Sequence, residues 1–293
     1  MRSMLFVPGD DMRKLMKARD TDADALIVDL EDAVASALKS SARQVTREFL
    51  QVERRQSVFV RINALEDPEY ADDLAAVVGG APDGIMLPKR RTADDVRTLD
   101  RILAALEARE GITHGAIRIL PIAMELAAAA FHLDGYRGVS VRLCGLMWGV
   151  EDLAVDINSE VLEADGRYLP AVELGRSLCL YAAAAAAAGV PAIDAVYSDF
   201  RNLDGLELAA AAAQRAGFSC KAAVHPHQVA IINRTFTPSE DAVAHAMRIV
   251  EAFRAEPERG AIAIDGRMHD RPHLRAAELV LSRNASARQG GAS

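Results

Sequence analysis

Short apolar segments recur along about the first 230 residues, and each is followed by a segment of helical composition. The eight apolar segments span residues 2–8, 24–31, 57–63, 84–89, 117–125, 145–150, 192–199 and 222–228. Between the fourth and fifth, apolar residues fall at Val96, Leu99, Ile102, Leu103 and Leu106, a spacing typical of an amphipathic helix. Strands that alternate with helices form βαβ units, so we expect parallel strands.

Eight βα units in one stretch of chain are the number that closes a (β/α)₈ barrel. A doubly wound open sheet is the alternative, because it uses the same units. The first strand-to-helix turn, "PGDDMR", lacks the GxGxxG pattern of many open sheets that bind dinucleotides. The pattern therefore predicts an α/β protein with a TIM barrel over residues 1–235.

The chain continues past the eighth unit with an extension, residues 236–293, that a barrel does not need. "SEDAVAHAMRIVEAFRAEPERG" and "RPHLRAAELVLSRNASA" have helical composition, and "AIAIDGRMHD" between them reads as extended chain with a turn. We expect a helical C-terminal extension that serves as a lid or an oligomer arm, with a disordered tail from about residue 288.

Composition narrows the protein class. The 293 residues carry a net charge of −8, and a nucleic-acid partner would favour a basic patch instead. Cys144, Cys179 and Cys220 are far apart and lack CxxC spacing, which argues against disulfides and zinc. The longest nearly apolar segment, "LCLYAAAAAAAGVPA", is too short to span a bilayer. We expect a cytoplasmic protein with no membrane or nucleic-acid partner.

Most apolar segments end in an ionisable side chain. In order, these ends carry Asp29 with Glu31, Arg61, Lys89, Glu125, Glu151 with Asp152, Tyr197 with Asp199, and His225. Active sites of (β/α)₈ barrels lie at the carboxyl ends of the strands, so we expect a shared polar mouth there. The period of two puts Asp29 and Glu31 on one face of their strand. Capping of the next helix is the alternative for both acids, and for Asp32 it is equally favoured.

Glu125 and Asp152 follow apolar interiors and lie at the ends of adjacent predicted strands. Two such carboxylates either raise one another's pKa or share a cation, and a pair of carboxylates with water suits Mg²⁺. The alternative is that they are exposed loop acids. Arg61 is placed for an anionic oxygen of a substrate, and a salt bridge to Asp29 or Glu31 is a compatible alternative.

Motifs in order along nearly the whole chain resemble the CitE-like branch of the HpcH/HpaI aldolase and citrate lyase family. They are "RSMLFVPG", "DALIVDLEDAV" followed by "KSSAR", "VRINA", "GIMLPK", "WGVEDLAVD", "GVPAIDAVYSDFRNLDGL" and "KAAVHPHQVAIINRTFTPS". The resemblance implies a (β/α)₈ barrel. It also implies Mg²⁺-dependent cleavage, or formation, of a carbon–carbon bond in a hydroxyacyl thioester.

The resemblance also implies roles for single residues. Glu125 and Asp152 match the Mg²⁺ ligands, and Arg61 matches the catalytic arginine that holds the substrate and its enolate. The expected substrate contacts are Arg61, Glu125, Asp29, Glu31 and Asp194. The positions expected to contact the coenzyme A portion of the substrate are Phe6, Arg13, Lys17 and Lys39.

"DGRMHDRP" resembles a lid motif whose last acid, here Asp270, acts on the acetyl methyl group across a subunit boundary. The resemblance therefore implies a homo-oligomer, a trimer or a hexamer, and favours a free-standing acyl-CoA lyase. Three positions depart from the family pattern: Leu126 replaces Thr, Cys220 replaces Gly, and His269 replaces an apolar residue.

These inferences predict a lyase that cleaves malyl-, citramalyl- or citryl-CoA to acetyl-CoA and a 2-oxo acid, or catalyses the reverse condensation. Three alternatives stay open. One is a citrate lyase beta subunit that acts on a carrier-protein thioester. Another is an aldolase that acts on free 2-oxo acids. The last is a binding or scaffold protein that has kept the barrel without the activity.

Overall fold

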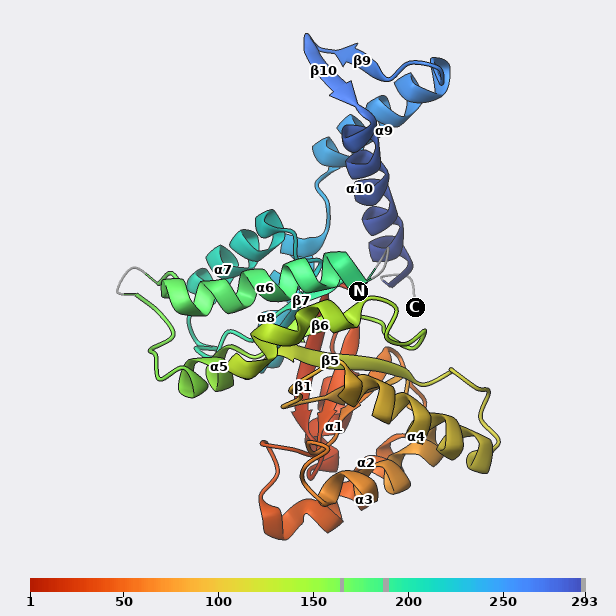
Figure 1. Cartoon of the computed structure of the whole chain (residues 1–293), viewed down its shortest axis with the longest axis vertical. Coiled ribbons are helices and arrows are strands. Elements are labelled where there is room, and N and C mark those ends of the chain that lie inside the picture. Colours follow the sequence, from red (N-terminus) through yellow and green to blue (C-terminus); the bar gives the residue numbers. More distant parts are fainter. Residues whose placement is uncertain (164–165, 187–189, 291–293) are drawn as a thin grey trace.

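The computed structural model describes residues 1–163, 166–186 and 190–290, and eight parallel strands close into a barrel within it (Figure 1). The strands are β1 (Ser3–Pro8), β2 (Ala25–Asp29), β3 (Ser57–Arg61), β4 (Gly84–Leu87), β5 (Arg118–Met124), β6 (Leu146–Trp148), β7 (Ala192–Asp194) and β8 (Cys220–Ala223). Strand β1 pairs with both β2 and β8, which leaves no open edge. The predicted barrel is confirmed, and the open-sheet alternative is wrong.

Helices surround the barrel and connect its strands. They are α1 (Met12–Arg19), α2 (Lys39–Phe49), α3 (Glu69–Val77), α4 (Asp94–Glu110), α5 (Val150–Asp156), α6 (Pro170–Ala186), α7 (Leu203–Ala216) and α8 (Pro226–Phe236). Short 3₁₀ segments, η1 (Ser36–Leu38) and η2 (Val78–Gly80), flank α2 and α3. After β5 the chain forms the 3₁₀ segment η3 (Ala127–Tyr136), so β5 and β6 lack a regular α-helical connection.

Strand β2 shows how the sequence pattern places the mouth residues. Ala25 and Ile27 point into the barrel, while Leu26 and Val28 pack outward under the helices. Both faces are buried, which explains why the strand reads as a continuous apolar run. Because side chains alternate along a strand, Asp29 follows Ala25 and Ile27 on the inward face. The last residue of β2 therefore projects into the mouth of the barrel.

Arg142 fixes the outer wall of the barrel near β5. Its guanidinium is fully buried and donates hydrogen bonds to Glu107 on α4 at 2.6 and 2.7 Å, and to Asp100 at 2.6 Å. Burial alone would raise the pKa of Glu107, but the bonds from Arg142 and from the backbone of Ile117 and Gly115 lower it to about 2. This buried pair ties α4 to the segment that enters β6.

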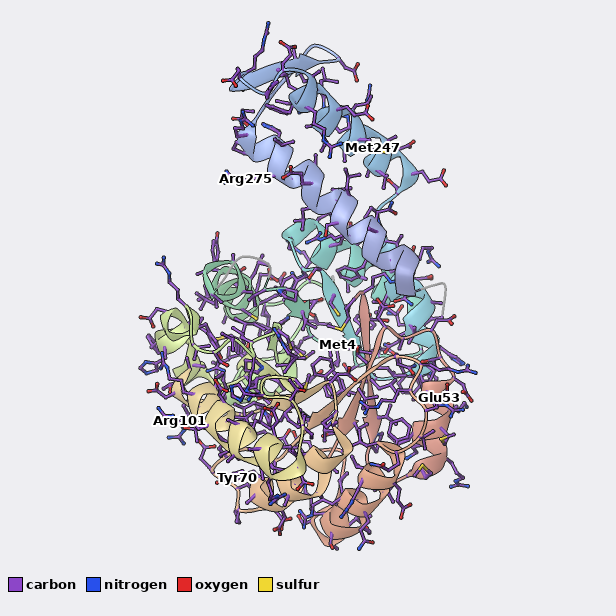
Figure 2. All side chains as sticks on the ribbon, turned by 90° about the vertical axis from the view of Figure 1, so that its right-hand side faces the viewer. Met4, Glu53, Tyr70, Arg101, Met247 and Arg275 are labelled. Atoms are coloured by element: carbon purple, nitrogen blue, oxygen red, sulfur yellow. The ribbon has the colours of Figure 1, made fainter. Side chains whose placement is uncertain are left out.

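The C-terminal extension forms an arm of two helices and a hairpin: α9 (Glu240–Ala255), β9 (Ala261–Ile264), β10 (Arg267–Asp270) and α10 (Arg271–Gly290). Figures 1 and 2 show it standing beyond the amino-terminal end of the barrel, with Met247 on α9 and Arg275 on α10 far from Met4 in β1. Asp265 and Gly266 both have positive φ, as a tight hairpin turn requires.

The arm has the predicted order of helix, extended turn and helix. The predicted disordered tail is helical from residue 288 to Gly290, and residues 291–293 lie outside the described part. Within the described part, every helix is too short or too polar to cross a bilayer.

We expect Glu107→Gln to lower the free energy of unfolding by about 3 kcal/mol, because it leaves the two Nη groups of Arg142 buried without their anionic partner, and Asp100 then binds only Nε. The folded pKa of Glu107 lies below its unfolded value, so the pair stabilises the fold above about pH 4.5 and loses this effect as the pH falls toward 2. Urea unfolding at neutral and acid pH measures both effects. Glu110→Gln, on the same helix, is the matched control and should cost less than about 1 kcal/mol. Equal losses in the two variants would contradict the assignment.

Candidate active site

A small cavity of about 80 Å³ lies at the carboxyl ends of the strands. Its lining includes Phe6, Arg61, Glu125, Trp148 and Asp152, so β1, β3, β5 and β6 or the segments after them all reach it. A larger cavity of about 800 Å³ shares the lining residues 150, 151 and 196 with it. The mouth therefore joins a confined acidic site to a space that can hold a much larger molecule.

Arg61 is held between two acids in this mouth. Its guanidinium donates to both oxygens of Asp29 at 2.8 and 2.5 Å, and its Nη1 lies 2.9 Å from Glu31. Burial opposes the charge, yet the bonds to Asp29 and the charges of Asp29 and Glu31 raise the pKa of Arg61. Its guanidinium also lies over the ring of Phe6 at 5.1 Å. The salt-bridge alternative for Arg61 is confirmed, and the guanidinium still borders the cavity.

Asp29 caps no helix, because the next helical segment, η1, begins only at Ser36; Asp29 instead binds the backbone of the turn after β2. Its two oxygens accept hydrogen bonds from the backbone N–H groups of Glu31 at 2.9 Å and Ala33 at 3.2 Å. These bonds fix the turn that follows β2 and so place Glu31 and Asp32. Asp32 is exposed and pairs with Lys89 at 2.8 Å.

Lys89 connects the acids of this mouth, a role that sequence analysis missed. Its backbone N–H donates to Glu125 at 2.5 Å, and its ammonium lies 2.9 Å from Glu31 and 4.0 Å from Asp152. The residue has a left-handed φ of 46°, which is unfavourable for a lysine and is held by these bonds. The sequence signal was its place directly after the apolar run "GIMLP", but the backbone conformation was not readable from it.

Glu125 is buried and electrostatically strained. Burial, with the nearby charges of Glu31 and Asp152, raises its pKa to about 8 despite the bond from Lys89 and the charge of Arg61. Gly149 lets the chain pass this carboxylate, since a Cβ there would lie 3.0 Å from its Cγ. Burial likewise raises the pKa of Glu31 to about 7, although Arg61 and Lys89 oppose it.

Asp152 lies in the first turn of helix α5, four residues after Trp148, which is the last residue of β6. The prediction placed it at the strand end itself, which is wrong, because β6 ends earlier, at Trp148. Its side chain is 37 % exposed, and it still lines the same cavity as Glu125. The prediction that the two carboxylates share one site is therefore met by the fold.

The donor set of the mouth suits a hard divalent cation. Its carboxylates are Asp29, Glu31, Asp32, Glu125, Glu151 and Asp152, and its cations are Arg61 and Lys89. Six negative charges against two positive ones leave an excess of four when all are ionised. In the described part of the chain no three His, Cys, Asp or Glu side chains are grouped to hold a metal. A cation here would rely on two carboxylates plus water and substrate oxygens, as Mg²⁺ does.

Asp194, at the end of β7, is buried among protein donors. It accepts hydrogen bonds from Trp148 and Arg176 at 3.0 Å each, and from Lys221 at 2.6 Å. Burial opposes ionisation, but the charges of Lys221 and Arg176 lower the pKa of Asp194. Asp194 is buried, so its expected contact with a substrate stays a prediction.

The four positions expected to contact coenzyme A differ in their availability. Phe6 lines the mouth, Arg13 is 94 % exposed, and Lys17 is also exposed on α1. The ammonium of Lys39 instead donates three hydrogen bonds of 2.7 Å, to the backbone oxygens of Leu30 and Glu31 and to Asn63. All three of its protons are used inside the chain, so Lys39 supports the turn after β2.

Asp270 is not brought to the other predicted site residues within one chain. It ends β10 in the arm, which stands beyond the opposite end of the barrel in Figure 1, and its carboxylate bonds His273 at 2.5 Å. A single copy of the chain therefore assembles Arg61, Glu125 and Asp152 but leaves Asp270 apart.

A family model described as HpcH/HpaI aldolase/citrate lyase matches residues 2–226. The chain is 35 % identical over 291 residues to citrate lyase subunit beta of Escherichia coli K12, covering 96 % of this chain and 92 % of the relative. It is 33 % identical over 306 residues to a (3S)-malyl-CoA thioesterase of Cereibacter sphaeroides, covering 100 % and 97 %. The structure of CitE from Mycobacterium tuberculosis with magnesium, acetoacetate and coenzyme A superposes with a TM-score of 0.79 at 34 % identity, covering 97 % and 98 %.

We expect Glu125→Gln to stabilise the metal-free protein at alkaline pH. The folded pKa of Glu125, about 8, lies above its unfolded value, so the wild type loses stability as the pH rises from about 4.5 through 8. Glutamine stays neutral, and the variant should be more stable by on the order of 5 kcal/mol well above pH 8 and equal near pH 4.5. Urea unfolding in EDTA across this range measures the difference.

Glu160, which is exposed and lines neither cavity at the mouth, is the matched control, and Glu160→Gln should keep the wild-type pH slope. If Glu125→Gln also kept that slope, the carboxylate would be ionised in the metal-free fold and the argument for a strained site would fail.

Proposed function

Because the chain belongs to the HpcH/HpaI aldolase/citrate lyase family and is a carbon–carbon lyase, we propose that its substrate is a 3-hydroxyacyl-CoA thioester. A malyl-, citramalyl- or citryl-CoA is cleaved to acetyl-CoA and a 2-oxo acid, or is formed in the reverse condensation. The observation that carries this proposal is the pairing of an anchored Arg61 with the buried carboxylate of Glu125 and the carboxylate of Asp152 in one cavity.

Glu125 and Asp152 would hold Mg²⁺ in this site. The excess of negative charge and the raised pKa of Glu125 support this, and a CitE structure similar to this one was solved with magnesium. When bound, Mg²⁺ polarises substrate oxygens and lowers the pKa of a coordinated hydroxyl. The backbone N–H of Lys89 keeps the carboxylate of Glu125 in place, while Glu125 gives up its proton to the solvent as a cation enters.

Arg61 is suited to stabilise the enolate oxygen of the departing acetyl thioester. Arg61 has five N–H groups, of which two donate to Asp29. The remaining N–H groups of Arg61 face Glu31 and the cavity. Because Asp29 and Glu31 hold the guanidinium before any substrate arrives, its charge needs little reorganisation when the enolate forms. The two acids thereby act as positioning residues for Arg61.

The remaining parts of the substrate would lie outside the small cavity. Arg13 and Lys17, exposed on α1, are the basic side chains still available for the phosphates of coenzyme A, with Phe6 at the entrance. Asp270 would be supplied by the arm of another copy and would protonate the acetyl carbon, or remove its proton in the reverse direction. This role requires a homo-oligomer, for which a trimer or a hexamer is the expectation.

A second candidate is a beta subunit that acts on a carrier-protein thioester, favoured by the 35 % identity to citrate lyase subunit beta. The same mouth would serve, because the reacting acyl group is the same. The two candidates differ in what carries the thioester, so assays on free coenzyme A esters separate them.

We expect the purified protein to release acetyl-CoA from at least one of malyl-, citramalyl- and citryl-CoA in Mg²⁺ and not in EDTA. Asp152→Asn should lower kcat/KM at least about 100-fold, because it removes a charged ligand from a two-carboxylate site. Separate quantification of free coenzyme A distinguishes carbon–carbon cleavage from thioester hydrolysis. If the folded protein shows no activity on any of the three esters, the proposal of an acyl-CoA substrate is refuted. A carrier-protein thioester or a free 2-oxo acid would then remain as the candidate substrate.

Arg61→Lys should lower kcat about 100-fold, since lysine keeps the charge but cannot hold both oxygens of Asp29 while facing the substrate. Steady-state kinetics on the ester that is cleaved provides the measurement. A change confined to KM would assign Arg61 to substrate binding alone.

Co-expression tests the supply of Asp270 by another copy. Asp270→Asn and Glu125→Gln should each be inactive as pure proteins, while mixed oligomers of the two regain activity at mouths that combine an intact arm with an intact Glu125. Inactivity of the mixed oligomers, with mixing shown by differential tags, would place Asp270 outside the reaction.

A further inference from the structure

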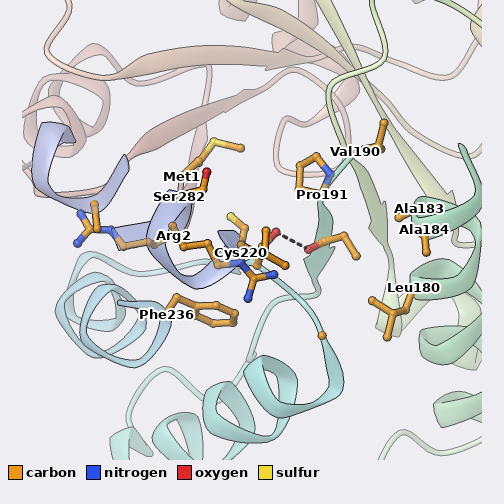
Figure 3. Close-up of a pocket in the computed structure, with 16 residues that line it drawn as sticks. Met1, Arg2, Leu180, Ala183, Ala184, Val190, Pro191, Cys220, Phe236 and Ser282 are labelled. Atoms are coloured by element: carbon orange, nitrogen blue, oxygen red, sulfur yellow. Dashed lines mark hydrogen bonds between the residues drawn. The ribbon is translucent and has the colours of Figure 1, made fainter. Parts of the chain in front are cut away.

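A further cavity, of about 430 Å³, lies at the amino-terminal end of the barrel, away from the two cavities at the mouth (Figure 3). Its floor comes from the first residues of β1, β7 and β8, and its sides come from α6, the end of α8 and the last turns of α10. Most of the lining is apolar, including Leu180, Ala184, Pro191, Phe236 and Leu279. The volume is in the range of small-molecule sites, and the residues of the candidate active site do not reach it.

Two arginines line this cavity, and they differ in their partners. Arg2 donates to Asp24 at 2.7 and 3.1 Å and to Thr237 at 3.2 Å, so its charge is compensated. Arg283, on α10, has no carboxylate within ion-pair distance among the described residues. Burial lowers the pKa of Arg283, and no described acid offsets that effect. A half-buried guanidinium that has no counter-ion and lies beside an apolar wall favours the binding of an anion.

We propose that this cavity binds a small amphipathic carboxylate, with its carboxylate on Arg283 and its aliphatic tail against the wall formed by α6 and Phe236. The guanidinium fork matches a carboxylate, and Arg283 has no acidic partner among the described residues that would compete with one. The apolar lining excludes a fully polar anion, because the tail side of the cavity offers mainly aliphatic and aromatic surface. This site is independent of the proposed reaction, since it uses none of the mouth residues.

The location of the cavity gives the ligand a structural effect. Helix α10 packs mainly against α9 in the arm. The cavity lies where the carboxyl-terminal turns of α10 border the barrel. A bound carboxylate contacts both bodies at once and so joins the arm more firmly to the barrel. Binding should therefore slow hydrogen exchange in the last turns of α10 as well as raise the melting temperature.

Octanoate is the probe. Octanol, which has the aliphatic tail without the carboxylate, and acetate, which has the carboxylate without the tail, are the control ligands. Titration calorimetry and thermal melts of the full chain should show octanoate binding, and binding at least about tenfold weaker for the other two. Arg283→Gln should weaken octanoate binding about tenfold. Arg275→Gln, an exposed position on the same helix, is the matched control and should bind as the wild type does.

Ala184→Phe, at an exposed position of the lining, should fill the cavity and abolish binding. Leu279→Trp fills it from α10 and replaces Ala184→Phe if that variant fails to fold. Absence of octanoate binding in the folded wild type would overturn the proposal. Equal binding by Arg283→Gln and Arg275→Gln would do the same, by showing nonspecific adsorption. A change of oligomeric state in the filled variants, without any octanoate effect, would show instead that another copy covers this cavity.

Discussion

Repulsion among carboxylates at one end of the barrel is the constraint on which the candidate site depends. Because side chains alternate along β2, Asp29 points inward at the end of that strand, and Glu125 follows the end of β5. The two carboxylates therefore lie at the same end of the barrel, and Glu31 lies just beyond Asp29. Arg61 and Lys89 hold this group together, yet two cations do not balance it. The chain folds around these acids, and burial, followed by the charges of Glu31 and Asp152, raises the pKa of Glu125. A cation and a substrate that arrive there find a site already arranged for positive charge.

Two groups of buried charges elsewhere in the barrel are paired within the chain. Arg142 and Glu107 satisfy each other in the outer wall, and Asp194 is surrounded by Arg176, Lys221 and Trp148 in the interior. Such networks stabilise one arrangement of side chains and leave nothing for a ligand to complete. The mouth and the cavity beside Arg283 differ from them in the same respect, because each contains charge that the described chain does not balance. This contrast separates the parts of the protein that hold its shape from the parts that can bind something.

Much of this arrangement was predictable, because it follows from local periodicity. The eight apolar segments give the barrel, and alternation along β2 gives the inward direction of Asp29. What the sequence could not show depends on contacts between distant segments or on backbone conformation. Lys89 joins residues 36 and 57 positions away through a left-handed backbone. Lys39 is turned inward by Leu30 and Asn63, and Asp194 by Lys221, 27 positions away. The end of β6 was misplaced because "GLMWGV" reads as one apolar run, while the structure ends the strand at Trp148.

The arm points away from the mouth of its own barrel, and in the proposed reaction this direction has a genetic consequence. An arm that completes another copy's site makes a contact between unlike surfaces, and repeating that contact closes only as a ring. A defect in one arm then inactivates the site of a neighbouring copy, while the mouth of the chain with the defective arm stays intact. Two differently damaged alleles could complement each other within one assembly, whereas a damaged arm would also impair sound copies beside it. Inheritance, and not only kinetics, would then follow from the direction in which one helix leaves the barrel.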